Sequence, residues 1–346
     1  MRIAIVNDVR MAVEAVRRVV LTQPAHQVAW VAMDGVEAVD LCAKDRPDLI
    51  LMDLIMPNMD GVEATRRIMA SSPCAIVVVT ADVYTNSSRV FEAMGAGALD
   101  AVNTPVLEHP ATSEGANALL AKIETIRKLI GASDGKKAFA PASAAPAQPA
   151  RHNHGWLVAV GSSAGGPAAL AKVLSQLPAD FPAPIVIVQH VDVQFAQGLA
   201  DWLNSQTPLH VRLAADGDSA GPGTVLLAGQ ENHLAFTGPN RLSYVREPAD
   251  CSYKPSVDVF FKSVAQFWKG DVLATLLTGM GRDGAEGLQL LHGLGHHTIA
   301  QDAKTSSVYG MPKAAVELQA ATEVLPLDKI GPRLSNLLDR KIKTHG

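Results

Sequence analysis

The segment from Gly161 to Gly165 reads Gly-Ser-Ser-Ala-Gly and follows a short apolar run. Glycine-rich turns between a strand and a helix either bind a phosphate or expose a serine on a tight elbow. The dinucleotide fingerprint needs a second glycine where Ser163 stands, and no Gly-Lys-Ser/Thr sequence follows, so neither common phosphate loop fits. The pattern fits Gly-x-Ser-x-Gly, in which the next amide, that of Ala164, is a candidate oxyanion donor. Ser163 is therefore a candidate nucleophile, with a plain glycine-rich turn as the alternative.

A serine nucleophile needs a general base and an acid that orients it. His190 ends the apolar run 184–190, so we expect it on the same sheet edge as Ser163. Two other histidines are weaker candidates: His210 lies within the run 209–213 (LHVRL), and His233 starts the predicted hairpin. Asp283 and Asp302 each follow a predicted strand, and position alone does not separate them. The order Ser, His, Asp differs from that of the α/β-hydrolases.

Polar residues also follow the predicted strands of the N-terminal part, namely Asn7, Asp8, Asp53, Thr80 and Thr104. Ligands bind parallel sheets at the carboxyl ends of the strands, and carboxylate and carbonyl oxygens suit Mg²⁺. Beside such a metal, Asp53 could attack a phosphoryl group. Acidic residues at strand ends are also common turn formers, and we favour that interpretation for Asp8 taken alone. The set that includes the run 51–61, LMDLIMPNMDG, favours the metal site.

Strand-like and helix-like patterns alternate on both sides of one boundary, which predicts an α/β protein with parallel sheets covered on both faces. Five short strands are expected in the N-terminal part, at 2–8, 27–32, 48–53, 74–81 and 99–104. Five more are expected in the C-terminal part, at 156–162, 184–190, 224–229, 272–280 and 297–302. The segment 233–245 carries Gly-Pro-Asn between alternating runs and is expected to form a hairpin.

Residues 131–155 are rich in Ala, Pro and Ser and lack periodicity, which is typical of a flexible linker. We therefore predict three segments, a domain at 1–130, the linker at 131–155 and a second domain at 156–346.

Composition narrows the function further. The 346 residues carry a formal net charge of −4, which argues against a nucleic-acid partner. Three scattered cysteines give neither a disulfide framework nor a zinc site and fit a reducing compartment. No leader-like segment opens the chain and no apolar stretch is long enough for a membrane helix. We expect a cytoplasmic protein without membrane insertion.

Residues 1–125 resemble a response-regulator receiver domain, on the matches at 7–8 (ND), 48–61 (DLILMDLIMPNMDG), 79–81 (VTA) and 93–105 (AMGAGALDAVNTP). The resemblance implies a flavodoxin-like, five-stranded parallel sheet with Asp53 as the phosphoacceptor. It also implies that Asp8, Asp53 and the main-chain carbonyl of Ile55 hold Mg²⁺, and that Thr80 senses the phosphoryl group.

The receiver part departs from the family at two positions. Asn7 replaces the first acid of the usual pair but can still supply an oxygen to the metal. Thr104 stands where the family has a lysine, and threonine cannot supply the charge that pairs with a phosphoryl group. The coupling of phosphorylation to output is therefore expected to differ from that of the family.

Residues 156–340 resemble the catalytic domain of the chemotaxis protein-glutamate methylesterases, the CheB family. The matching blocks are VGSSAGG at 160–166, VIVQH at 186–190, PSVDVFF at 255–261, LLTGMGRDG at 276–284, IAQD at 299–302 and YGMPKAA at 309–315. The match implies a doubly wound, mostly parallel domain with Ser163 as nucleophile, His190 as general base and acid, and Asp283 as the residue that orients it. The match also implies that the amide of Met280 binds the oxyanion. The amide of Ala164 is a candidate from the elbow geometry, at a position where the family usually has threonine.

The two resemblances together imply a response regulator that hydrolyses glutamyl methyl esters on a methylated chemoreceptor and releases methanol. Glutamine deamidation is a second activity of the family. A receptor-coupled histidine kinase would phosphorylate Asp53 and relieve inhibition by the receiver, and the esterase reaction needs no cofactor. The stretches 1–8 and 100–112 also resemble the methylesterases of the Wsp surface-sensing systems of pseudomonads. The alternative is a signalling adaptor that binds a kinase or receptor and has little catalysis of its own. The missing receiver lysine gives it some support, whereas the set of Ser163, His190 and Asp283 weighs against it.

Overall fold

The computed structural model describes residues 1–83, 85–105, 114–131, 155–249, 251 and 253–342. The chain divides into two compact units, residues 1–140 and 141–346. The predicted linker lies outside the described residues, except for Gly131, which ends a helix, and Gly155.

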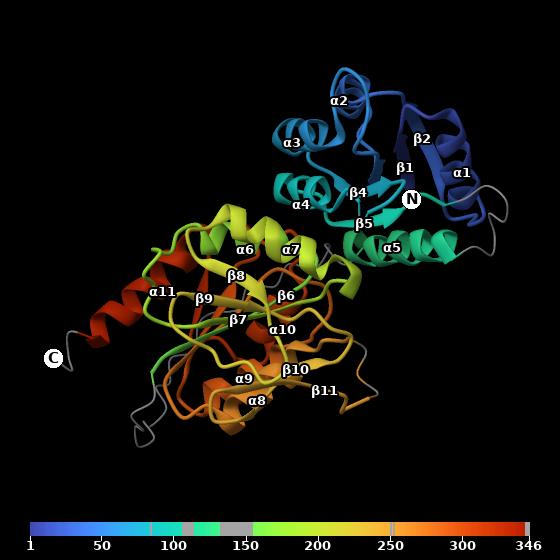
Figure 1. The fold of residues 1–346 in the computed structure, drawn as a ribbon. Helices are drawn as coiled ribbons and strands as arrows, with labels where there is room; N and C mark the ends of the chain where they lie inside the picture. The colour runs from blue at the N-terminus through green and yellow to red at the C-terminus, as the bar shows by residue number, and fades with distance from the viewer. Residues whose placement is uncertain (84, 106–113, 132–154, 250, 252, 343–346) are drawn as a thin grey trace. The chain divides into compact units, whose positions relative to one another are not determined.

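The N-terminal unit alternates strands and helices along the chain (Figure 1). Its strands are β1 (Arg2–Val6), β2 (Gln27–Ala32), β3 (Leu49–Met52), β4 (Ala75–Thr80) and β5 (Asp100–Asn103). Its helices are α1 (Arg10–Leu21), α2 (Gly35–Lys44), α3 (Gly61–Ser71), α4 (Ser87–Ala96) and α5 (Glu114–Gly131). Helices α2 and α3 begin at aspartate caps, whose side chains accept amide hydrogens of the first turn.

All neighbouring strands of this unit are parallel, in the order β2-β1-β3-β4-β5. Helices α1 and α5 contact each other, and α3 contacts both α2 and α4, so the helices form two layers around the sheet. The strand order reverses between β1 and β3. Ligand sites of open α/β sheets form at such a reversal, and here the loops after β1 and β3 carry Asp8 and Asp53.

The C-terminal unit repeats this architecture with more strands (Figure 1). Its strands are β6 (Leu157–Ser162), β7 (Ile185–Gln189), β8 (His210–Leu213), β9 (Thr224–Leu227), β10 (His233–Gly238), β11 (Arg241–Val245), β12 (Val272–Leu276), β13 (His297–Gln301) and β14 (Glu323–Leu325). Its helices are α6 (Gly166–Leu174), α7 (Val193–Gln206), α8 (Val257–Phe267), α9 (Ala285–Gly293), α10 (Met311–Glu317) and α11 (Leu327–Ile342).

Seven of these strands form one parallel sheet in the order β14-β13-β12-β6-β7-β9-β8. The order reverses between β6 and β12, which places the ends of these two strands at the expected ligand site. The hairpin predicted at 233–245 is confirmed as the antiparallel pair β10-β11. The short edge strands β8 and β14 were not predicted, because three or four residues carry too little pattern to distinguish them from loops.

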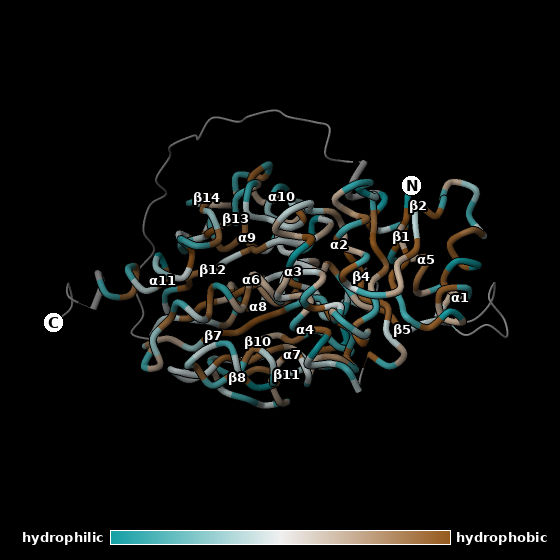
Figure 2. Tube along the Cα trace, turned by 90° about the horizontal axis from the view of Figure 1, so that it is seen from above, coloured by the Kyte–Doolittle hydropathy of each residue, from teal (hydrophilic) through white to brown (hydrophobic). Residues whose placement is uncertain are grey.

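Each unit has its own hydrophobic core. The N-terminal core joins β1, β3, β4 and β5 to α1 and α5, and the larger C-terminal core joins the central strands to α8, α9 and α10. Figure 2 shows hydrophobic colouring concentrated along the strands of both units. The predicted α/β class with two parallel sheets is confirmed. Among the described residues, no helix has the length and apolar character needed to cross a membrane.

Candidate functional site

Ser163 lies in the turn between β6 and α6, at the point where the strand order reverses. Its amide donates to the carbonyl oxygen of Thr278, just after β12, at 3.0 Å. The chain after β12 approaches the serine so closely that a Cβ on Gly279 would lie 2.8 Å from the Cβ of Ser163. Glycine at this position therefore allows the two strand ends to meet around a half-buried serine.

His190 follows β7, the neighbour of β6 on the other side. The register pairs Ser162 with Gln189, so the next residues along the chain, Ser163 and His190, are neighbours at the sheet edge. The amide of His190 also donates to the carbonyl oxygen of Ser162 at 3.0 Å. The predicted proximity of Ser163 and His190 thus follows from parallel pairing.

A buried polar network holds the loops around this turn. The Gln189 side chain accepts from the Ser162 hydroxyl at 2.6 Å and donates to the carbonyl oxygens of Ser163 and His190 at 2.9 and 2.8 Å. The Thr278 hydroxyl donates to the carbonyl oxygen of Ala164 at 2.9 Å, and the Thr278 amide donates to the Gln301 side chain at 2.8 Å. Sequence reasoning did not assign these residues a role, although Gln189 and Thr278 lie within blocks that resemble the family.

The imidazole of His190 is bonded to Asp283 rather than to Asp302. Its Nε2 lies 2.8 Å from Oδ2 of Asp283, and both side chains are largely buried. The carboxylate of Asp302 instead accepts hydrogen bonds from Thr305 and closes a turn. The structure therefore separates the two acids that position along the chain could not.

The other ring nitrogen of His190 makes no hydrogen bond to Ser163 or to any other described residue. Nδ1 is buried and has no hydrogen-bond partner in the part of the chain that the structure describes. With Nε2 donating to Asp283, the neutral imidazole carries its lone pair on Nδ1, which makes Nδ1 the basic atom. This is the reverse of the serine-protease arrangement, in which Nδ1 faces the aspartate.

Asp283 is fixed by the first turn of α8, a helix distant in sequence. Its carboxylate accepts from the Ser256 hydroxyl at 2.8 Å and from the amides of Val257 and Asp258 at 2.7 and 3.0 Å. Burial raises the pKa of Asp283. The hydrogen bond to His190, the charge of His190 and the bonds from these amides outweigh the effect of burial, so the pKa lies below its usual range. The carboxylate therefore stays ionised at neutral pH and can stabilise an imidazolium.

The weaker histidine candidates lie elsewhere. His210 is exposed on the edge strand β8. His233 is fully buried, accepts the amide of Ser256 at Nδ1 at 3.0 Å and lies 3.1 Å from the carbonyl oxygen of Pro248 at Nε2. Because Ser256 in turn holds Asp283, the contribution of His233 to the site is to support the start of α8.

The two predicted oxyanion donors lie on the loops that flank Ser163. Ala164 is the next residue of the turn, and Met280 follows the glycine that packs against the serine. Within the described residues, neither amide donates to another protein group. Free amides beside a nucleophile can bind the negative oxygen of a tetrahedral intermediate.

The second predicted site forms at the edge of the N-terminal sheet. Asp53 follows β3 and is buried, and its Oδ1 accepts the amide of Leu54 at 2.8 Å. Burial and the nearby charge of Asp8 raise the pKa of Asp53 to about 6, although the amides of Leu54 and Ile55 oppose the shift. A buried carboxylate beside a second carboxylate is an arrangement that a divalent cation stabilises.

The donor set around Asp53 fits Mg²⁺. Asp8 and Asp53 supply carboxylate oxygens, and the loop after β3 supplies main-chain carbonyls such as that of Ile55. Asn7 is also buried, but its Oδ1 accepts the amide of Val9 at 2.8 Å and so forms the turn after β1. Asn7 therefore fits as a neighbour of the ion better than as a main ligand.

Thr80 and Thr104 occupy adjacent strand ends on the same edge. The amide of Thr104 donates to the carbonyl oxygen of Thr80 at 2.8 Å. The Thr80 hydroxyl is buried and accepts from the side chain of Asn86, the residue before α4, at 3.2 Å. The structure thus brings both predicted switch residues to the edge that carries Asp53, and Thr104 brings no charge there.

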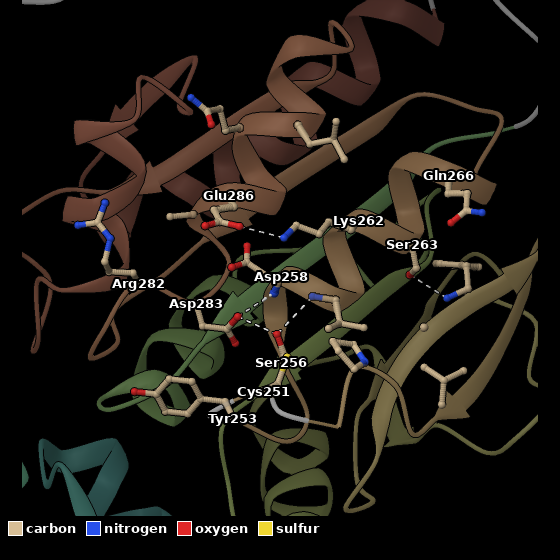
Figure 3. A pocket seen from close by; sticks show the side chains of 18 of the residues that line it. Cys251, Tyr253, Ser256, Asp258, Lys262, Ser263, Gln266, Arg282, Asp283 and Glu286 are labelled. Carbon is tan, nitrogen blue, oxygen red and sulfur yellow. Dashed lines mark hydrogen bonds and ion pairs between the residues drawn. The ribbon is translucent and has the colours of Figure 1, made fainter.

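A large open groove borders the Asp283 side of the C-terminal site. It has a volume of about 1150 Å³ and is lined by residues of the hairpin β10-β11, α8 and α9. Figure 3 shows Tyr253, Ser256 and Asp283 at one end of the groove and the ion pair between Lys262 and Glu286 above them. Asp283 thus separates the groove from His190.

Comparison with known proteins gives the same two parts. A family model described as CheB methylesterase matches residues 158–334, and one described as response regulator receiver domain matches residues 3–110.

Two relatives match almost the whole chain. A protein from Burkholderia lata named protein-glutamate methylesterase/protein-glutamine glutaminase 1 is 56% identical over 338 residues, which cover 97% of this chain and 99% of the relative. A protein from Pseudomonas aeruginosa named protein-glutamate methylesterase/protein-glutamine glutaminase 3 is 55% identical over 341 residues, covering 98% and 100%. The crystal structure of the Thermotoga maritima CheB methylesterase catalytic domain is 38% identical, covers 52% of this chain and 97% of that chain, and has a TM-score of 0.49.

Proposed function

The chain belongs to the CheB methylesterase family, and we propose that it is a serine hydrolase that removes methyl groups from glutamyl side chains of a methylated chemoreceptor. The observation that carries the proposal is the buried pair of His190 and Asp283 beside Ser163 at the sheet reversal. The names of the relatives support the substrate class. The geometry favours hydrolysis over the adaptor alternative, because a scaffold has no need of a buried, oriented imidazole.

The proposed reaction is acyl transfer through Ser163. Nδ1 of His190 takes the hydroxyl proton while Oγ attacks the ester carbonyl, and Asp283 stabilises the resulting imidazolium. The amides of Met280 and Ala164 bind the oxyanion, each contributing roughly 3–4 kcal/mol if it matches donors in comparable enzymes. Methanol leaves with the proton from Nδ1. Water then attacks the acyl-enzyme with the same base, which frees the glutamate carboxyl group and regenerates Ser163.

We propose glutamine deamidation as a second activity of the same site. An amide carbonyl can form the same acyl-enzyme, with ammonia leaving in place of methanol. The relatives carry both activities in their names.

We further propose that residues 1–130 form a receiver that regulates the hydrolase, with residues 131–155 as the linker and 156–346 as the catalytic domain. A histidine kinase coupled to the receptor would donate the phosphoryl group to Asp53. Mg²⁺ would be held by Asp8, Asp53 and the carbonyl of Ile55, with Asn7 beside it, and when bound it neutralises charge on the transferring phosphoryl group. Thr80 would bind that group after transfer. The resemblance to Wsp-type methylesterases, which rests partly on residues 106–112 outside the described structure, stays a prediction.

Methanol release tests the proposed function. Membranes that carry methylated chemoreceptors are incubated with the full chain, with Ser163→Ala, or with Ser205→Ala, a control whose hydroxyl bonds within α7. We expect release by the wild type and by Ser205→Ala and none by Ser163→Ala. Equal release by Ser163→Ala would exclude this serine as the nucleophile, and no release by any of the three would favour the adaptor.

A further inference from the structure

The ring of Tyr253 lies flat against the imidazole of His190. The two ring centroids are 4.3 Å apart and the planes differ by 4°. Tyr253 is half-buried on the segment between β11 and α8, three residues before the serine that caps α8 and binds Asp283. Figure 3 shows Tyr253 beside Asp283 at the end of the groove. The ring therefore separates one face of the imidazole from the groove.

Tyr253 also contacts the turn that follows Met280. A Cβ built on Gly281 would lie 3.0 Å from the Tyr253 hydroxyl oxygen, so the phenol packs directly over this glycine. Gly281 has a φ of +84° and begins the turn that leads to Asp283. One side chain thus packs against both the proposed base and the loop of the proposed oxyanion donor.

The imidazole needs such a support. Its bond to Asp283 fixes the position of Nε2, but a single hydrogen bond still allows the ring to rotate about the line through that bond. Rotation would change the direction of the lone pair on Nδ1, the atom that the proposed reaction needs as a base. A flat aromatic surface at 4.3 Å restricts the plane of the ring. The same surface attracts the imidazolium that forms when Nδ1 takes the serine proton.

We propose that Tyr253 is a positioning residue for His190, which holds the plane of the imidazole and stabilises its protonated form in the transition state. The inference rests on the proposed esterase function. The aromatic ring, rather than the hydroxyl group, carries the effect, and this separates the inference from a role in binding substrate.

The test compares Tyr253→Leu with Tyr253→Phe in the full chain. Leucine fills much of the space but has no aromatic face, whereas phenylalanine keeps the ring. For Tyr253→Leu we expect kcat for methanol release to fall about tenfold with KM within about twofold of wild type. The acid limb of the pH profile of kcat/KM should move by about half a pH unit to lower pH, because the protonated imidazole loses its stabilisation. Tyr253→Phe should restore the wild-type kcat and profile.

The outcomes that contradict the inference are distinct. A higher KM with unchanged kcat in Tyr253→Leu would show that the residue binds substrate, and wild-type kinetics in that variant would show that the stacking is incidental. A low kcat in Tyr253→Phe would assign the effect to the hydroxyl group. Equal thermal unfolding of the two variants excludes misfolding as the cause of a difference between them. An NMR titration gives a second test that does not depend on stability. If the His190 ring resonances of Tyr253→Leu match those of the wild type, the inference is overturned. Absence of methanol release by the wild type would instead overturn the proposed function, and this inference with it.

Discussion

At the scale of single residues, Asp283 has two connected roles. Its carboxylate lies within hydrogen-bond distance of Nε2 of His190, and its other hydrogen bonds join it to Ser256 and to the amides at the start of α8. An uncharged side chain of the same shape would keep part of this network but could not stabilise an imidazolium.

For Asp283→Asn we expect kcat for methanol release to fall by roughly 10³- to 10⁴-fold, as in other enzymes of this kind. The asparagine amide group can donate toward Nε2, which favours the tautomer that leaves no lone pair on Nδ1. Asp302→Asn is the matched control, because this side chain closes a turn with Thr305, and its kcat should stay within about threefold of wild type. A comparable loss in both variants would contradict the assignment of the acid.

The carboxyl group of Asp53 predicts a dependence of stability on pH. Its pKa rises from 3.8 to about 6 in the folded chain, so the proton is bound more tightly in the folded than in the unfolded state. The tighter binding of the proton stabilises the folded chain fully below the pKa of the unfolded chain, 3.8, and this stabilisation is lost as pH rises through about 6. The free energy of unfolding changes by at most ~3 kcal/mol over this range. Without Mg²⁺, Asp53→Asn should therefore unfold at a higher temperature than wild type at pH 7.5.

The advantage of Asp53→Asn should shrink below pH 5, where the wild-type carboxyl group is protonated, and also at pH 7.5 when Mg²⁺ is added. Differential scanning calorimetry of the full chain measures both. An advantage that is the same at pH 5 and pH 7.5 would mean that the charge of Asp53 is not its source.

The sequence predicts the position of residues that end strands better than the position of residues held by tertiary contacts. Ser163, His190 and Asp53 each follow a recognisable apolar run, and parallel pairing brings such strand ends to one edge. Asp283 and Asp302 satisfy the same rule equally. The two acids differ because the start of α8 donates an amide to Asp283. The sequence around Asp283 or around Asp302 does not show where α8 packs.

At the scale of elements, the turn between β6 and α6 depends on the packing of Gln189. A Cβ on Gly166 would lie 1.8 Å from Oε1 of Gln189, so no larger residue fits unless that side chain moves. The sequence indicated the turn through its glycines, but the partner of Gly166 could not be predicted, because it lies on another strand.

Gly166→Ala should therefore displace Gln189 and release its bonds to Ser162 and to the carbonyl oxygens of Ser163 and His190. We expect a loss of about 1–3 kcal/mol in the free energy of unfolding, measured with urea, together with a clear fall in kcat. Gly293→Ala at the end of α9 is the control, since its new methyl group meets no atom within 4 Å, and its stability should not fall. Wild-type stability and kcat in Gly166→Ala would show that Gln189 is not needed.

At the scale of the whole molecule, each proposed chemistry has a sheet and a hydrophobic core of its own. The division into two α/β units was visible in the sequence because a segment without periodicity interrupts the alternation of strands and helices.

Separate cores predict separable chemistry. Ser163→Ala should accept a phosphoryl group at Asp53 from acetyl phosphate and Mg²⁺ as the wild type does, measured by phosphate-affinity electrophoresis. Asp53→Asn should keep its basal methanol release but lose any response to acetyl phosphate. Loss of basal release in Asp53→Asn would contradict the independence of the two sites.

The order of strands also determines when each site can appear during synthesis of the chain. The N-terminal sheet and its core are complete once β5 and α5 have left the ribosome, so the receiver can fold while the rest of the protein is still being made. In the C-terminal unit, β6 is translated first, but its neighbour across the reversal is β12, where Val272 pairs with Leu157. The loop that carries Met280 and Asp283 is translated later still. A nascent chain can therefore become competent for phosphorylation well before it can hydrolyse an ester, and hydrolysis is the last property that the protein acquires.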